Sequence, residues 1–171
     1  PIPVVAAGGI ADGRGIVAAL ALGASGVWLG TRFLASKEAN IHRTYREKLL
    51  AAKVEDTIYS QLFNLGWEDA PHRTLRNSTV KMWEKAGCPE KGNRPKEGET
   101  IGYTSTGKAI IRYSDTIPLP QMQGDLEALA LYGGQSVGLI NHLDSSSKII
   151  ERLVAEIKTT YQSLNKHLTF L

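Results

Sequence analysis

The sequence contains a single cysteine, Cys88, in 171 residues. One thiol excludes an intramolecular disulfide framework and any metal site built from several cysteines, so no metal is expected. The residues around it, Gly87 to Lys91, are polar and loop-like. We therefore expect a reduced thiol and a cytoplasmic protein.

The sequence also has no long hydrophobic run. A membrane-spanning helix needs roughly 18 or more consecutive apolar residues, and no segment approaches that length. The first residues, Pro1 to Val5, include neither an initiating Met nor a basic region, so they do not resemble a signal peptide. They are typical of the interior of a longer chain, because a strand is expected almost at the first residue.

Strong charge is absent as well, since the formal net charge is +3. Lysines and arginines gather modestly between Lys85 and Lys96, but without the interleaved aromatic side chains of single-strand binders. Neither a nucleic acid nor a membrane is an expected partner. The composition, 42% hydrophobic and 22% charged, instead predicts a folded globular protein.

Two strand–helix units are predicted in the first fifty residues. The apolar run Val4 to Ala7 has the pattern of a strand buried on both faces of a parallel sheet. Asp12 is expected to cap a helix that ends at Gly23. A second strand, residues 27–29, stops at Gly30, and Ser36 is expected to cap a further helix. Two parallel strands form no stable sheet alone, so other strands must come from outside this sequence.

The pattern changes after about residue 54. We expect a smaller α+β domain and then a long amphipathic helix whose wide apolar face needs a large partner, either the outer wall of the fold or a second copy in a homodimer. The predicted domains are 1–53 (two βα units), 54–135 (second domain) and 136–171 (C-terminal helical segment). Within them the expected elements are strands at 57–63 and 109–113, a hairpin turn at 104–108, and helices at 78–86, 125–132 and 144–167.

Both early strands end in glycine-containing turns, at Gly8-Gly9 and at Gly30-Thr31. In a parallel α/β fold such turns share one edge of the sheet, where ligands bind. Glycines there let backbone N–H groups approach an anion closely, and Thr31 adds a hydroxyl donor. The simpler interpretation is that the glycines only permit tight turns. Two such turns at successive strand ends favour a phosphate site.

Residues around these turns resemble the nitronate monooxygenase (2-nitropropane dioxygenase-like) family. The matching segments are residues 6–10, 20–24, 29–34, 76–77 and 133–139. The resemblance implies that the chain is the C-terminal part of a (β/α)8 TIM barrel, contributing its last two βα units, with a smaller inserted second domain. It also implies an FMN cofactor whose phosphate is held by Ala7, Gly8, Gly9, Gly30 and Thr31.

The resemblance implies an FMN-dependent enzyme that oxidises alkyl nitronates with O2. In that enzyme, this chain would be completed by the N-terminal half of the same barrel. That family's catalytic histidine would lie upstream of Pro1, so the catalytic residue is unknown and the fragment alone is expected to be inactive. An NAD(P)H:quinone reductase on the same fold is one alternative. A non-catalytic phosphate-ligand binding fragment is another.

Other candidate sites are weaker. Residues 102–109 nearly match the phosphate-binding loop of nucleotide hydrolases, but Ala109 replaces the required hydroxyl and a strand is expected to follow. The histidines (His42 in a helix, His72 in a loop, His142 and His167 flanking the last helix) have no acidic or metal-ligand partner at a telling spacing. We therefore expect surface or structural roles for all four.

Overall fold

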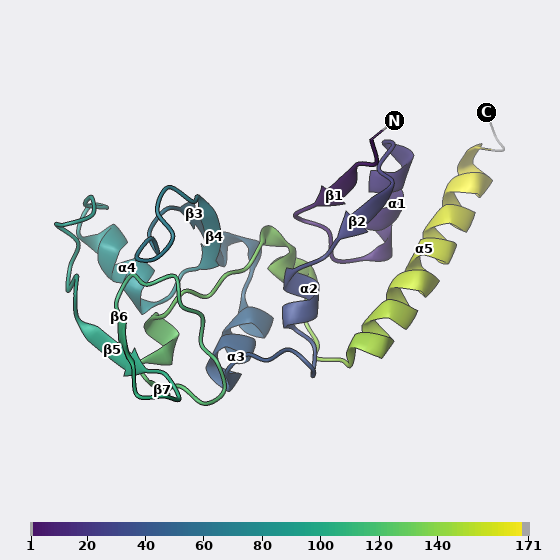
Figure 1. The fold of residues 1–171 in the computed structure, drawn as a ribbon. Coiled ribbons are helices and arrows are strands. Elements are labelled where there is room, and N and C mark those ends of the chain that lie inside the picture. Colours follow the sequence, from purple (N-terminus) through teal and green to yellow (C-terminus); the bar gives the residue numbers. More distant parts are fainter. Residues whose placement is uncertain (1, 169–171) are drawn as a thin grey trace. The chain divides into compact units, whose positions relative to one another are not determined.

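The computed structural model describes residues 2–168, which form an α/β fold divided into two compact units (Figure 1). The first unit comprises Pro1–Ala39 and Gly134–Leu171, and the second comprises Asn40–Gly133. The second unit is thus one continuous segment that interrupts the first. The observed boundaries lie at 39/40 and 133/134, whereas the sequence suggested 53/54 and 135/136.

A parallel pair of strands begins the first unit. Strand β1 (Val5–Ala7) pairs in parallel with strand β2 (Gly26–Trp28), in a register that places Val5 opposite Gly26 and Ala7 opposite Trp28. The helix between them makes the strand–helix–strand unit that the sequence predicted. The elements of the first unit are β1 (Val5–Ala7), α1 (Gly13–Ala21), β2 (Gly26–Trp28), α2 (Thr31–Leu34), η3 (Gln135–Leu139) and α5 (Ser146–Leu168).

Local signals set the ends of α1. The side chain of Asp12 accepts a hydrogen bond from the N–H of Gly15 at 2.9 Å, which confirms the predicted N-cap. After the helix, Gly23 adopts a φ of 99°, in the left-handed region that favours glycine. The short local sequence therefore fixes both ends of this helix.

The core of the first unit lies where α1 meets α5. Ile16 of α1 packs against Ile149 and Leu153 of α5, and all three are buried. Gly13 lies at the closest approach, since a Cβ added there would be 2.4 Å from the Cβ of Glu156. Two helices can come this close only where one of them carries no side chain.

The other face of the strand pair is exposed within the chain. Val5 and Trp28 belong to this face and are 55% and 72% exposed. The described residues of the first unit therefore do not by themselves bury both faces, which the sequence predicted for a sheet completed by other strands. The physical reason is that α1 and α5 cover the pair from one side, and the sheet of the first unit holds two strands.

The apolar face of α5 is likewise only partly covered. Ile149 and Leu153 are buried, whereas Ile150 and Tyr161 are 53% and 65% exposed. Towards the end of the helix an apolar groove of about 430 Å³ opens between α1 and α5, lined by Val17, Leu20, Ala21, Ile157, Tyr161, Leu164 and Asn165.

The helix expected after Ser36 begins later. Ser36 instead forms a parallel bridge with Asp144, and the chain stays irregular until α3 (Arg43–Ala51). The N-cap of α3 is His42, whose Nδ1 accepts a hydrogen bond from the N–H of Thr44 at 3.1 Å. The predictions of Ser36 as a cap and of His42 within the helix are therefore wrong.

The second unit combines short helices with two antiparallel sheets. Strand β3 (Thr57–Ser60) pairs with β4 (His72–Leu75). In the other sheet, β5 (Thr100–Tyr103) lies between β6 (Ala109–Ile111) and β7 (Gln123–Gly124). The predicted hairpin is confirmed, with Thr104 to Lys108 as its turn. The elements are α3, η1 (Val54–Asp56), β3 (Thr57–Ser60), β4 (His72–Leu75), α4 (Ser78–Lys85), β5 (Thr100–Tyr103), β6 (Ala109–Ile111), β7 (Gln123–Gly124) and η2 (Leu126–Ala128).

Two other predictions in this unit are wrong. His72 lies in strand β4 and is buried, not in a loop. The helix expected at 125–132 is a single 3-10 turn at Leu126–Ala128, after which the chain extends. The extended part is held by non-local bonds, because Leu75 N–H donates to the Leu131 carbonyl at 2.8 Å and Ala130 N–H donates to that of Thr116.

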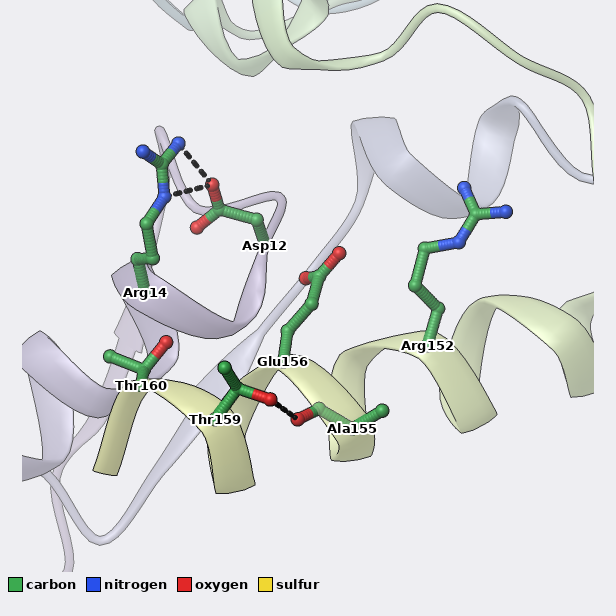
Figure 2. Close-up of a pocket in the computed structure, with 7 residues that line it drawn as sticks. All are labelled: Asp12, Arg14, Arg152, Ala155, Glu156, Thr159 and Thr160. Carbon is green, nitrogen blue, oxygen red and sulfur yellow. Dashed lines mark hydrogen bonds and ion pairs between the residues drawn. The ribbon is translucent and has the colours of Figure 1, made fainter. Parts of the chain in front are cut away.

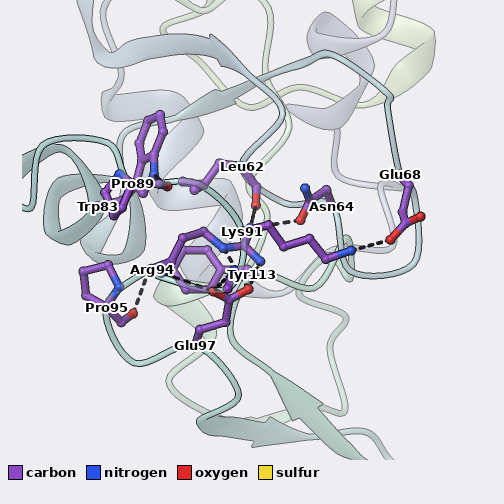
Figure 3. Close-up of polar contacts among 11 residues, drawn as sticks. Leu62, Asn64, Glu68, Trp83, Pro89, Lys91, Arg94, Pro95, Glu97 and Tyr113 are labelled. Carbon is purple, nitrogen blue, oxygen red and sulfur yellow. Dashed lines mark hydrogen bonds and ion pairs between the residues drawn. The ribbon is translucent and has the colours of Figure 1, made fainter.

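A buried arginine organises the loop between α4 and β5 (Figure 3). The guanidinium of Arg94 donates to the Leu62 carbonyl at 2.8 Å and to Asn64 Oδ1 at 2.9 Å. It also pairs with Glu97 and lies 4.3 Å from the centroid of the Tyr113 ring. These contacts supply the loop with a core that its Pro, Gly and Lys residues cannot provide.

No helix in the part of the chain that the structure describes is long and apolar enough to cross a membrane.

Candidate functional site: the glycine turns of β1 and β2

The two glycine turns leave neighbouring strands at the same end. Since Ala7 is paired with Trp28 in a parallel register, Gly8-Gly9 and Gly30-Thr31 follow at one edge of the sheet. Gly8, Gly9 and Gly30 are exposed, and Thr31 is half-buried. The structure therefore places the two predicted turns together at the accessible C-terminal ends of β1 and β2.

The two turns differ in whether their backbone conformation requires glycine. Gly8 and Gly9 have φ values of 90° and 72°, which side chains rarely adopt. Backbone conformation alone explains both. Gly30 has a φ of −88° and ψ of −67°, which any residue tolerates, and a Cβ there would meet nothing within 4 Å. Neither backbone strain nor packing in this chain requires glycine at position 30.

Backbone donors are available at the turns. Within the described residues, the N–H groups of Gly9, Gly30 and Thr31 donate to no protein acceptor. Exposed backbone N–H groups that converge from adjacent turns are a common means of binding a phosphate.

The N-terminus of α1 does not add to this donor set. Its Gly13 N–H donates to Glu156 Oε2 at 2.8 Å, and its Gly15 N–H donates to Asp12. These two amides of α1 are therefore already bonded to carboxylates of the protein.

Thr31 is positioned by a distant part of the chain. Its Oγ1 accepts a hydrogen bond from the N–H of Gly134, the residue that begins η3, at 3.0 Å. A hydroxyl that accepts one bond still has its own hydrogen to donate. In the sequence, Gly134 belongs to one of the segments that resemble the family, and the structure brings it to Thr31.

Arg32, which directly follows the turn, is a part of the site that sequence reasoning missed. It is only 4% exposed, and its NH2 group donates to His142 Nε2 at 3.1 Å while NH1 approaches the His142 carbonyl at 3.4 Å. Burial, and then the charge of Arg152, lower the pKa of Arg32, and Asp144 opposes them. No local pattern signals this contact, because 110 residues separate the two side chains.

Sequence spacing indicated no acidic partner for His142, but the structure places Asp144 beside it. Its Nε2 lies 3.2 Å from Asp144 Oδ2, which also pairs with Arg152 at 3.0 Å. Burial, followed by the positive charges of Arg152 and Arg32, lowers the pKa of His142 below its ordinary value, although Asp144 and Glu156 act to raise it. A neutral His142 accepts from Arg32 through Nε2 and donates from Nδ1 to Asn141 Oδ1 at 2.6 Å.

Two of the other histidines have structural or surface positions. His72 accepts from the Phe63 N–H and is stacked on Trp67, and His167 is exposed on α5. In the described ranges, no group of three or more His, Cys, Asp or Glu side chains is arranged to hold a metal ion.

A polar groove of about 480 Å³ lies between α1 and α5 rather than at the turns (Figure 2). Its charged groups already have protein partners: Asp12 and Glu156 cap α1, Arg14 pairs with Asp12, and Arg152 pairs with Asp144. We therefore assign the candidate site to the strand ends. The lining residues are Asp12, Arg14, Arg152, Ala155, Glu156, Thr159 and Thr160.

Comparisons with known proteins bear on the whole described chain. Residues 1–156 match a family model described as nitronate monooxygenase. The nitronate monooxygenase npaC of Metarhizium robertsii is 36% identical, with 98% of this chain and 44% of that protein covered. The (3aS,4S,5R,7aS)-5-hydroxy-7a-methyl-1-oxo-octahydro-1H-indene-4-carboxyl-CoA dehydrogenase of Rhodococcus jostii is 32% identical, with 91% of this chain and 50% of that protein covered.

Among solved structures, FabK from Thermotoga maritima is similar, with a TM-score of 0.68 and 34% identity. That alignment covers 98% of this chain and 48% of FabK. The chain thus spans about half the length of the relatives that it matches.

Proposed function

Because this chain belongs to the nitronate monooxygenase family, we propose that it provides the phosphate site of an FMN-dependent oxidoreductase. In the complete protein, that enzyme oxidises alkyl nitronates with O2. The phosphate is held by Ala7, Gly8 and Gly9 of the first turn and by Gly30 and Thr31 of the second.

The conformation of Gly30 is the observation that carries this proposal. Nothing within the chain requires a glycine there, as neither φ nor packing excludes a side chain. A close approach of a ligand to the backbone does require one. The neighbouring N–H groups of Gly9 and Thr31, which donate to no acceptor among residues 2–168, are the matching donors. These residues fit a phosphate monoester, whose oxygens accept several hydrogen bonds.

We further propose that β1 and β2 are the last two strands of a (β/α)8 barrel, with its N-terminal half as their partner. The exposed apolar side chains of Val5 and Trp28 support this, since parallel strands are almost always covered on both faces. The phosphate turns of such barrels often follow the last two strands.

The roles of the chain's own residues in the reaction are binding and orientation. Bound FMN supplies the redox chemistry. Turn amides and the Thr31 hydroxyl fix the phosphate end, and the Gly134 N–H in turn orients Thr31. As the family resemblance implies, we assign the proton-transferring residue to the part of the barrel outside this chain.

The direct test uses the full-length protein. We expect it to purify with a yellow chromophore that is released on denaturation as FMN, and to consume oxygen when given propionate 3-nitronate. Absence of bound flavin, together with no binding of added FMN, would refute the phosphate assignment. Anaerobic NADH separates the alternatives: rapid flavin bleaching with quinone turnover and no nitronate oxidation would assign the protein as a quinone reductase.

A further inference from the structure

Helix α2 and the residues just after it are hydrogen-bonded to one continuous segment, residues 134–146. Gly134 N–H binds Thr31 Oγ1, and His142 binds the Arg32 guanidinium through both its ring and its carbonyl. Further along, Lys37 N–H donates to the Asp144 carbonyl at 2.9 Å. The residues that begin α2 are therefore fixed by contacts distant in sequence.

The start of α5 completes this arrangement. Glu38 Oε2 accepts hydrogen bonds from the N–H and the hydroxyl of Ser146, at 2.8 Å and 3.0 Å. Thr31, Arg32 and Glu38 thus each bind a different point of the segment. All of these contacts lie within the first unit.

Arg32 stands out among them because it is charged and buried. A guanidinium taken out of water is costly unless its donors are satisfied. Among the described residues no carboxylate bonds it directly: its partners are a carbonyl and a neutral imidazole nitrogen, while Asp144 is paired with Arg152. Such an arrangement holds a backbone segment in place rather than neutralising a charge.

We propose that Arg32 is a positioning residue for the cofactor phosphate: by clamping α2 to His142 it holds Gly30 and Thr31 where they receive the phosphate. This inference rests on the proposed phosphate site. It assigns Arg32 no contact with the cofactor. Its effect is therefore expected to be specific to ligands that carry the phosphate, since Arg32 acts only through the position of Gly30 and Thr31.

The test compares FMN with riboflavin, which lacks the phosphate, as ligands of the full-length protein freed of flavin. For Arg32→Gln we expect a Kd for FMN raised by about tenfold or more, with the Kd for riboflavin changed by less than about twofold. At saturating FMN, kcat and the KM for nitronate are expected to recover, because the variant lacks only the means of placing the turn.

Two further variants keep the result interpretable. His142→Phe removes the ring acceptor but keeps the carbonyl, so a smaller loss of FMN affinity in the same direction is expected even if Arg32→Gln does not fold. Arg152→Gln lies in the same charged cluster without touching α2, and we expect it to leave the Kd for FMN within about threefold of the unmodified value.

The outcomes are distinct. If the unmodified protein binds riboflavin as tightly as FMN, the phosphate site itself is wrong. If it prefers FMN and Arg32→Gln keeps that preference, the positioning role is wrong. Equal losses for both ligands, with a lower thermal midpoint of the flavin-free protein, would reduce Arg32 to a structural role and also overturn the inference.

Discussion

The carboxylate of Glu156 accepts a hydrogen bond from the N–H of Gly13, so that helix α5 caps helix α1. The same two residues mark the closest approach of the helices, because a Cβ at Gly13 would lie 2.4 Å from the Cβ of Glu156. Capping and packing therefore depend on each other: a side chain at position 13 would push away the carboxylate that satisfies its own N–H.

Gly13→Ala is expected to destabilise the protein by about 1–3 kcal/mol, as overpacking of a close helix contact does. The added methyl group would meet the backbone of Ile157 at 2.5 Å, which cannot move as a flexible side chain can. Urea unfolding of the full-length protein measures the change. Gly26→Ala is the matched control, since a Cβ there has open space. Equal stability of both variants would contradict the close packing.

Gly30→Ala is expected to lower FMN affinity by about tenfold or more without changing the unfolding midpoint of the flavin-free protein. The methyl group has open space within the chain but occupies the volume that the phosphate needs. Fluorescence titration with FMN measures the affinity. Unaltered FMN binding would show that the ligand does not approach Gly30.

The stability of the first unit is expected to decline as the pH falls below about 6.5, the ordinary pKa of histidine. In the folded protein, burial and then Arg152 and Arg32 lower the pKa of His142. The unfolded chain therefore takes up the proton first, so the contribution of the neutral form is complete above the unfolded value and is lost on acidification towards the folded one.

Thermal midpoints between about pH 5 and pH 8 check this dependence. The midpoint of His142→Phe is expected to fall less steeply on acidification than that of the unmodified protein. His167→Gln is the control, because that side chain is exposed on α5. An identical slope in the unmodified protein and in His142→Phe would exclude His142 as the titrating group.

Arg94→Ala is expected to cost about 3–5 kcal/mol, since it leaves Glu97 and the Leu62 carbonyl without their buried partner. Lys96→Gln, whose ion pair with Glu99 is solvent-exposed, should change the free energy of unfolding by less than about 1 kcal/mol. Urea unfolding distinguishes the two. A small effect at Arg94 would mean that the loop between α4 and β5 is held in another way.

Sequence patterns predicted the elements whose causes are local. Asp12 and Gly23 determine where α1 begins and ends through local conformation and contacts. The turn of the β5–β6 hairpin likewise forms within the short segment that joins the two strands. The parallel pairing of β1 with β2 followed from the strand–helix–strand spacing. These predictions needed no knowledge of the rest of the chain.

The failures have non-local causes. Ser36 caps no helix because its backbone pairs with Asp144, more than a hundred residues later. The segment that contains Leu131 carries a helical pattern but is drawn into extended form by its bond with Leu75. Likewise, the two turns at the strand ends could be predicted from their glycines, whereas the contact of Arg32 with His142 joins two segments that no periodicity relates.

The insertion of the second unit has a consequence for how the chain can vary. It leaves the first unit after Ala39 and rejoins it at Gly134, the residue that binds Thr31. On either side, Lys37 and Glu38 are tied to Asp144 and Ser146 by contacts that involve the first unit alone. The inserted segment can thus lengthen or shorten while the contacts that anchor residues 31–38 to residues 134–146 stay the same.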